Sequence, residues 1–349
     1  MTCLDVSLNF MPAFYAKHIG VTYGEPYYFD PGYRAAVERA EGRFLFETLG
    51  RFGVGSPDPQ PSPSVFIQPV DLVMRTQGAP WRFPADATVE SQGTPWAGLT
   101  AEEIAAIDPR QAARHPVIDS LVAQYRELQR MYGEQADIFG TKSGTMNIHT
   151  PYTTAHQLCG EDLFSLLLND PDGVRMIFAK VWEIYQAIFA RVTAVTGARL
   201  TRVQLGDCAA SLISLRTYRE LILPTNQALA SQFEQAGYHS CGRSTHLLTA
   251  FRDLPKLDSI QLGPGTDLAV SAQLLPELHL QPLVDPILML MGDPDMIHRT
   301  IEEMLYVTAT APAITLCAWS FDRDTPLENA AALYDAVDRA KPHLQNARS

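Results

Sequence analysis

The chain has 349 residues, of which 46% are apolar and 19% are charged, and its formal net charge at pH 7 is −12. This length and apolar content suffice for one large domain with a buried core, such as an α/β barrel. The acidic balance and the lack of basic runs argue against nucleic-acid binding, because phosphates require clustered Lys and Arg.

The first residues and the number of cysteines indicate the cellular compartment in which the protein is expected. The first ten residues, MTCLDVSLNF, lack the pattern of a secretory signal, and no stretch reaches the roughly 20 apolar residues that cross a membrane. The five cysteines are odd in number and scattered, which argues against a disulfide framework and favours a reducing cytoplasm. They are Cys3, Cys159, Cys208, Cys241 and Cys317.

The N-terminal part has the least regular pattern. Residues 53–64 (GVGSPDPQPSPS) and residues 84–95 are rich in turn-forming Gly and Pro, and residues 65–73 (VFIQPVDLV) predict a strand. No run is long enough to be a linker between domains. We therefore expect residues 1–130 to be an irregular N-terminal extension with the first barrel elements, in one domain with residues 131–349.

From about residue 136 onward, predicted strands alternate with predicted helices. Apolar residues at helical spacing mark residues 172–195 as a long amphipathic helix. Further helices are predicted at 162–168, 215–232, 244–252, 267–275, 293–307 and 326–339, and strands at 202–205, 237–240, 259–262, 281–284 and 313–318. Such alternation predicts a parallel sheet with crossover helices. The number of repeats favours a closed (β/α)8 TIM barrel over an open Rossmann sheet, whose Gly-rich fingerprint is missing.

Polar residues directly follow several predicted strands, and the carboxyl ends of barrel strands converge on the face where chemistry occurs. His239-Ser240-Cys241 places an imidazole and a thiol on the same side of the backbone, since positions i and i+2 share a face. Cys317, at another strand end, would add a second sulfur. Zinc favours such donors, and three protein ligands leave one position open for catalysis. The alternative is buried core cysteines with an unrelated histidine.

Five collinear segments carry a resemblance to a known family. They are TPYTTAHQLCGEDLFSLLLNDPDGV (150–174), GDCAASLISLRTYRELILP (206–224), HSCG (239–242), VDPILMLMGDPDMI (284–297) and TPLENAAALYDAV (325–337). Together they resemble the uroporphyrinogen decarboxylase superfamily, and within it the zinc-dependent branch typified by methylcobalamin:coenzyme M methyltransferases. The resemblance spans residues 139–337 and implies an α/β barrel. It also implies that His239, Cys241 and Cys317 are the zinc ligands.

The resemblance implies an activity as well. Zinc would hold a small-molecule thiol as its thiolate, and a methyl group would pass between that sulfur and a corrinoid such as methylcobalamin, or another activated methyl donor. By the same resemblance, the corrinoid would be carried by a separate partner protein, and this sequence contains no D-x-H-x-x-G motif of a corrinoid-binding domain. The alternatives are a uroporphyrinogen decarboxylase-like enzyme and a non-catalytic binding barrel. Only Arg75 matches the arginines of the decarboxylase motif, and a decarboxylase would leave Cys241 and Cys317 unexplained. The methyl donor, the thiol and the oligomeric state stay open.

Other residues are candidates for the pocket. Asp207 is expected to orient substrate or to act as a displaceable fourth ligand, or else to cap the helix near Ser214. Arg243 is a candidate for binding an acidic end of the substrate, or a solvated surface residue. His149 is expected to line the pocket or to be exposed, and Tyr152 to pack against a flat ligand or in the core. We expect Cys208 to point away from the site, into the barrel wall.

Overall fold

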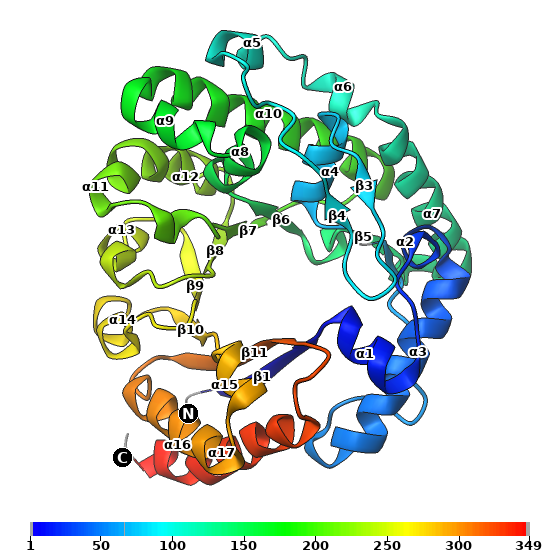
Figure 1. The fold of residues 1–349 in the computed structure, drawn as a ribbon, viewed down its shortest axis with the longest axis vertical. Helices are drawn as coiled ribbons and strands as arrows, with labels where there is room; N and C mark the ends of the chain where they lie inside the picture. The colour runs from blue at the N-terminus through cyan, green and yellow to red at the C-terminus, as the bar shows by residue number, and fades with distance from the viewer. Residues whose placement is uncertain (1–2, 66, 347–349) are drawn as a thin grey trace.

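The main element of the computed structural model, which describes residues 3–65 and 67–346, is a seven-stranded sheet. Its strand order is β1-β11-β10-β9-β8-β7-β6, and all neighbours are parallel. These strands are β1 (Cys3–Phe10), β6 (Thr145–His149), β7 (Arg202–Gly206), β8 (Gln235–Ser240), β9 (Leu257–Leu262), β10 (His279–Pro282) and β11 (Ala313–Phe321). The sheet curls, and the helices that connect its strands lie on its outer side (Figure 1).

The alternation of strands and helices after residue 136 is confirmed. The helices of this part are α8 (Pro151–Cys159), α9 (Asp162–Asn169), α10 (Pro171–Thr196), α11 (Leu215–Thr217), α12 (Leu223–Ala230), α13 (Leu248–Phe251), α14 (Leu268–Leu274), α15 (Pro286–Met291), α16 (Pro294–Val307) and α17 (Leu327–Asn346). A π-helical turn at Tyr218–Ile222 joins α11 to α12. The strand predicted at 281–284 begins and ends two residues earlier, as β10.

Helix α10 shows how the sequence produces one of these elements. Asp170 caps its first turn by accepting a hydrogen bond from the Gly173 backbone N–H, and Gly197 ends it in the left-handed conformation that glycine adopts without strain. Its apolar face is buried along its whole length, from Val174 to Val192. Each fully buried aliphatic side chain contributes roughly 1.5–3 kcal/mol, so this face anchors the helix in the core.

The expectation of an irregular N-terminal part is wrong. β1 pairs in parallel with β11, so the start of the described chain belongs to the main sheet. Much of the remainder is helical: α1 (Pro12–Ile19), α2 (Glu25–Phe29), α3 (Pro31–Leu49), α4 (Pro69–Thr76), α5 (Ala101–Ala105), α6 (Arg110–Ala113) and α7 (Pro116–Tyr132). The strand predicted at 65–73 is limited to β2 (Ser64–Val65), Phe66 lies outside the described residues, and α4 begins at Pro69, a residue suited to the first turn of a helix.

Two small sheets complete the architecture. β2 pairs in parallel with β5 (Asp137–Ile138), and β3 (Trp81–Arg82) pairs antiparallel with β4 (Glu90–Ser91). The α/β class with a curled parallel sheet is therefore confirmed, whereas β2 and β5 stand apart from the seven hydrogen-bonded strands of the main sheet. None of the described helices has the combination of length and hydropathy that crossing a membrane requires.

Candidate functional site

The carboxyl ends of β6 to β9 bring polar residues to one level of the sheet. His149 on β6 pairs with Gly206 on β7, Gly206 pairs with His239 on β8, and His239 pairs with Gln261 on β9. Because paired residues on adjacent parallel strands point to the same face, His149, His239 and Gln261 are neighbours on one side of the sheet. Gly206 contributes no side chain between the two histidines.

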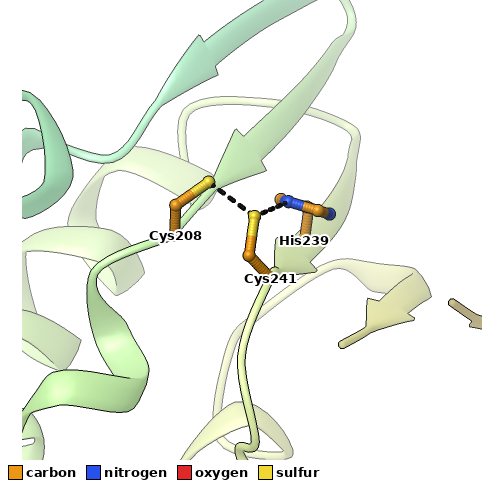
Figure 2. Close-up of side chains that lie close together, drawn as sticks. All are labelled: Cys208, His239 and Cys241. Atoms are coloured by element: carbon orange, nitrogen blue, oxygen red, sulfur yellow. Dashed lines mark hydrogen bonds between the residues drawn. The ribbon is translucent and has the colours of Figure 1, made fainter. Parts of the chain in front are cut away.

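Three side chains converge where β7 and β8 end. The Nε2 atom of His239 lies 2.8 Å from the sulfur of Cys241, and that sulfur lies 3.0 Å from the sulfur of Cys208. Figure 2 shows the three side chains pointing toward one another from two neighbouring strand ends. Their ligand atoms all lie within 4.8 Å of one another, which makes them a group able to hold a metal ion. Cys241 is exposed and Cys208 is half-buried, so the group is open to solvent.

The turn that carries Cys241 is held by the turn after β9. A Cβ atom on Gly263 would lie only 2.0 Å from the carbonyl oxygen of Cys241, so only glycine allows this close approach. The hydroxyl of Thr266 donates to the Gly242 carbonyl at 3.3 Å and accepts from the Ser244 backbone N–H at 3.0 Å. These contacts fix the backbone on both sides of the thiol.

Gln261 orients the imidazole of His239. Its side-chain oxygen Oε1 is hydrogen bonded to Nδ1 of His239. An amide oxygen only accepts, so Nδ1 carries a proton, and Nε2 is the ring nitrogen that faces Cys241. Metal-binding histidines commonly donate their second N–H to a neighbouring acceptor in this way. The buried Gln261 side chain therefore fixes the tautomer that a metal on Nε2 would need.

The electrostatics of the group distinguish its two cysteines. The hydrogen bond with Cys208 lowers the pKa of the Cys241 thiol to about 5, against the effect of burial and with help from His239. The same hydrogen bond, together with burial and the negative charge of Cys241, raises the pKa of Cys208. Burial lowers the pKa of His239, but the hydrogen bond and charge of Cys241 outweigh it, so the net shift is upward. Cys241 is thus the more nucleophilic sulfur.

Cys317 is not part of this group in the described structure. Its side chain is buried, its sulfur lies 3.6 Å from the Thr315 carbonyl oxygen, and burial raises its pKa to about 11. The nearby Gln261 side chain, which contacts Nδ1 of His239, opposes part of this rise in the Cys317 pKa. Of the three predicted metal ligands, the structure therefore brings His239 and Cys241 together, and Cys317 lies outside the group.

Asp207 anchors the end of β7 instead of reaching the cysteines. Its carboxylate is fully buried and accepts hydrogen bonds from four side chains, namely Thr150 (2.9 Å), Thr153 (2.8 Å), Tyr238 (2.6 Å) and Asn226 (3.4 Å). Burial raises its pKa, although these hydrogen bonds favour the charged form. The predicted cap near Ser214 is not formed by Asp207, because the Ser214 hydroxyl caps that helix itself.

The expectation that Cys208 points into the barrel wall is wrong. The wall side of this segment is occupied by the Asp207 carboxylate and its hydrogen-bond donors. Cys208 is left on the open side, where its sulfur faces Cys241. We infer that the anchoring of Asp207 is what presents Cys208 to the site.

The other predicted pocket residues differ in their placement. The His149 ring lies over Gly206, and burial together with the nearby His239 lowers its pKa to about 4, so it is neutral at pH 7. Tyr152 is fully buried and donates to the Ala209 carbonyl at 3.3 Å, which fits core packing. Arg243 is exposed near Gly265, and it has no hydrogen bond or ion pair with any residue that the structure describes.

Two residues of the site were not identified from the sequence. Gln261 is one, and Trp319 at the end of β11 is the other. The Trp319 ring stacks on His239, with ring centroids 6.2 Å apart and an interplanar angle of 24°, and its N–H donates to the Ser7 hydroxyl at 3.2 Å. A signal was available, because Trp319 follows Cys317 by two residues and so shares its face of the strand.

Comparison with known proteins places the chain in a family. The uroporphyrinogen decarboxylase (URO-D) family matches residues 98–340. The methylated-thiol–coenzyme M methyltransferase of Methanosarcina mazei is 26% identical over 193 residues, which cover 52% of this chain and 49% of that protein. The chain thus matches about half the length of this curated relative.

A solved structure supports the same relationship at the level of the fold. A methyltransferase from Methanosarcina mazei superposes with a TM-score of 0.66 over 97% of this chain and 93% of that chain, at 16% identity. The family match covers more than half of the chain. The protein therefore belongs to the uroporphyrinogen decarboxylase family, with similarity to the methyltransferase branch of that superfamily.

Proposed function

We propose that this protein is a zinc-dependent methyltransferase, which transfers a methyl group between a small-molecule thiol and a corrinoid. One observation carries the proposal: Nε2 of His239 and the sulfur of Cys241 lie 2.8 Å apart at the carboxyl end of β8. The other ring nitrogen, Nδ1, is hydrogen bonded to Gln261. The name of the curated relative, which specifies a methylated thiol and coenzyme M, supports a thiol as the substrate class.

The donor set fits zinc. Imidazole nitrogen and cysteine sulfur are the ligands that zinc prefers, and the Nδ1–H of His239 already has its acceptor. We propose His239, Cys241 and Cys317 as the protein ligands, as the resemblance implies. Cys317 would have to leave its buried position to join the other two. Zinc bound here would lower the pKa of a substrate thiol and supply its thiolate at neutral pH.

Residues around the metal ligands would bind and orient the substrate. Arg243 is exposed and unpaired among the described residues, so its guanidinium is available for a sulfonate or carboxylate at the far end of the thiol. Trp319 stacks on His239 and restricts the imidazole from one side. The His149 ring is neutral at pH 7, so it adds no positive charge that would compete with Arg243 for the negatively charged end of the substrate. Asp207 acts as a positioning residue, through the backbone of Cys208.

We propose a corrinoid protein as the partner and a closed barrel as the complete fold. Cys241 is exposed at the carboxyl ends of the strands, which is where a methyl donor on a second protein would have to approach. For the fold, β2 and β5 pair with each other and lie in sequence between β1 and β6, the two edges of the main sheet. Added to the seven strands of the main sheet, one of these two strands would complete a (β/α)8 barrel.

The test combines metal content with methyl transfer. Purified protein should contain about one zinc per chain and should demethylate methylcobalamin in the presence of small thiols. Cys241→Ala should lose both properties, while Cys159→Ala, a cysteine substitution outside the group, should keep them. A wild-type protein that binds no zinc after reconstitution and transfers no methyl group would contradict the proposal. It would favour a decarboxylase-like or a binding function instead.

A further inference from the structure

Cys208 has no role in the ligand set that the family resemblance implies, yet it is the third member of the observed group. It follows the end of β7 and is half-buried, with its sulfur 3.0 Å from that of Cys241. The group consists of residues whose side chains commonly bind metals, and their donor atoms lie within 4.8 Å of one another: Cys208, His239 and Cys241. The group is assembled by two adjacent strand ends, and it needs no rearrangement of the fold.

The distances within the group can be compared with those around zinc. With Zn–S near 2.3 Å and Zn–N near 2.0–2.1 Å, tetrahedral geometry separates two sulfurs by about 3.8 Å, and a sulfur from a nitrogen by about 3.6 Å. The observed separations are 3.0 Å between the sulfurs and 2.8 Å between Cys241 and His239. Each would have to open by less than about 1 Å, which side-chain rotation can supply.

The surrounding structure decides which second sulfur can reach that position. Nε2 of His239 faces Cys241, whereas Nδ1 faces Gln261, and the Gln261 side chain also lies near Cys317. A metal on Nε2 and Cys241 therefore has Cys208 directly beside it, whereas Cys317 lies outside the group whose donor atoms are within 4.8 Å of one another. The buried Asp207 network holds the backbone that carries Cys208 in place.

We propose that Cys208 is a ligand of the metal, so that the ends of β7 and β8 together supply Cys208, His239 and Cys241. This inference rests on the zinc dependence in the proposed function, and it extends the ligand set beyond the one implied by the family. A site of this kind takes a soft divalent cation such as Zn²⁺ or Co²⁺. Two sulfurs and one nitrogen leave a fourth position. Cys317 would fill it before substrate binds, and the substrate thiol would displace Cys317.

Cobalt substitution counts the sulfur ligands directly. Co²⁺-loaded wild type and Cys208→Ser would be compared under reducing conditions by their sulfur-to-cobalt charge-transfer absorption, and their zinc affinities by competition with a chelator. We expect Cys208→Ser to lose the absorption of one sulfur, roughly one third to one half of the band, and to bind zinc at least about tenfold more weakly. The matched control is Cys159→Ser, which makes the same change outside the group and should alter neither value.

A second measurement uses the unaltered chain, so it does not depend on how a variant folds. Alkylation by iodoacetamide, mapped by mass spectrometry, would be followed at each cysteine with and without zinc. We expect zinc to protect Cys208 and Cys241 together. The inference is overturned if zinc protects Cys241 while Cys208 reacts at its metal-free rate, or if Cys208→Ser keeps the full absorption band and zinc affinity. Those results leave the proposed function standing, whereas a wild type that binds no metal overturns both.

Discussion

Two strands of the same sheet carry a cysteine toward the site, and the two thiols have opposite properties. Cys241 directly follows β8; it is exposed, lies between Cys208 and His239, and has its pKa lowered to about 5. Cys317 lies in the middle of β11; it is buried, and burial raises its pKa to about 11. The residue type is the same, but one thiol is in the loop after its strand and the other is inside its strand. The neighbours that each thiol meets there decide whether it is a nucleophile or a packed side chain.

The strongest way to test this difference is to remove each thiol. Zinc sites of this type bind with roughly 10–16 kcal/mol, so losing one of three or four ligands should cost about 3–4 kcal/mol, or several hundredfold in affinity. We expect that loss for Cys241→Ala, measured by chelator competition. For Cys317→Ala we expect a loss of affinity at least about tenfold smaller, because Cys317 must leave its buried position to bind zinc and the free energy of that step offsets most of the gain from its bond to the metal. Equal losses in the two variants would break the comparison, because they would show that Cys317 reaches the metal without this cost.

The pH dependence of thiol reactivity should show the same contrast in metal-free protein. A pH of 7 is above the pKa of Cys241, which is about 5, so this residue is a thiolate. The same pH is below the pKa of Cys317, which is about 11, so that residue is a thiol. Because the thiolate is the reactive form, we expect alkylation of Cys241 to be at least about 100-fold faster. The rate at Cys241 should fall as the pH drops through 5, and that at Cys317 should rise toward pH 11. Similar pH profiles at the two sites would contradict the assigned environments.

Gln261 contacts the imidazole of His239, and replacing it should weaken metal binding. Gln261→Leu removes the acceptor for the Nδ1–H of His239, and loss of such a partner typically weakens metal binding by about 10- to 100-fold. Gln261→Glu keeps an acceptor and should restore most of the affinity. If the leucine variant binds zinc as tightly as wild type, Gln261 does not orient His239.

The smallest effect is expected at Trp319. Its stacking on His239 is worth about 0.5–1.5 kcal/mol, so Trp319→Leu should change the KM for the thiol or the zinc affinity by roughly two- to tenfold. Isothermal titration with zinc and steady-state kinetics would separate the two effects. Trp182→Leu serves as the control, because this half-buried tryptophan on α10 lies on an outer helix. An effect as large as that of Cys241→Ala would mean that Trp319 contacts the reacting groups.

The sequence predicted the C-terminal part of the fold better than the N-terminal part. α10 was identifiable because its apolar residues recur at helical spacing along one buried face. α3 was not, since its few buried residues include Arg34 and small Ala35 and do not form an apolar stripe. α7 does carry helical spacing, from Val117 to Leu128, so the sequence held a signal for a helix there. β1 is recognisable as part of the sheet only through its pairing with β11.

The sequence by itself determined the pairing of His239 with Cys241. The two residues are separated by one residue at a strand end, so their side chains share a face of the strand regardless of the remaining sequence. Only the tertiary structure decided which other side chains join them. The register of β7, β8 and β9 sets Cys208 on one side of the imidazole and Gln261 on the other, and Cys317 stays outside the group. Strand register depends on contacts between residues that are distant in the sequence, and local patterns do not encode it.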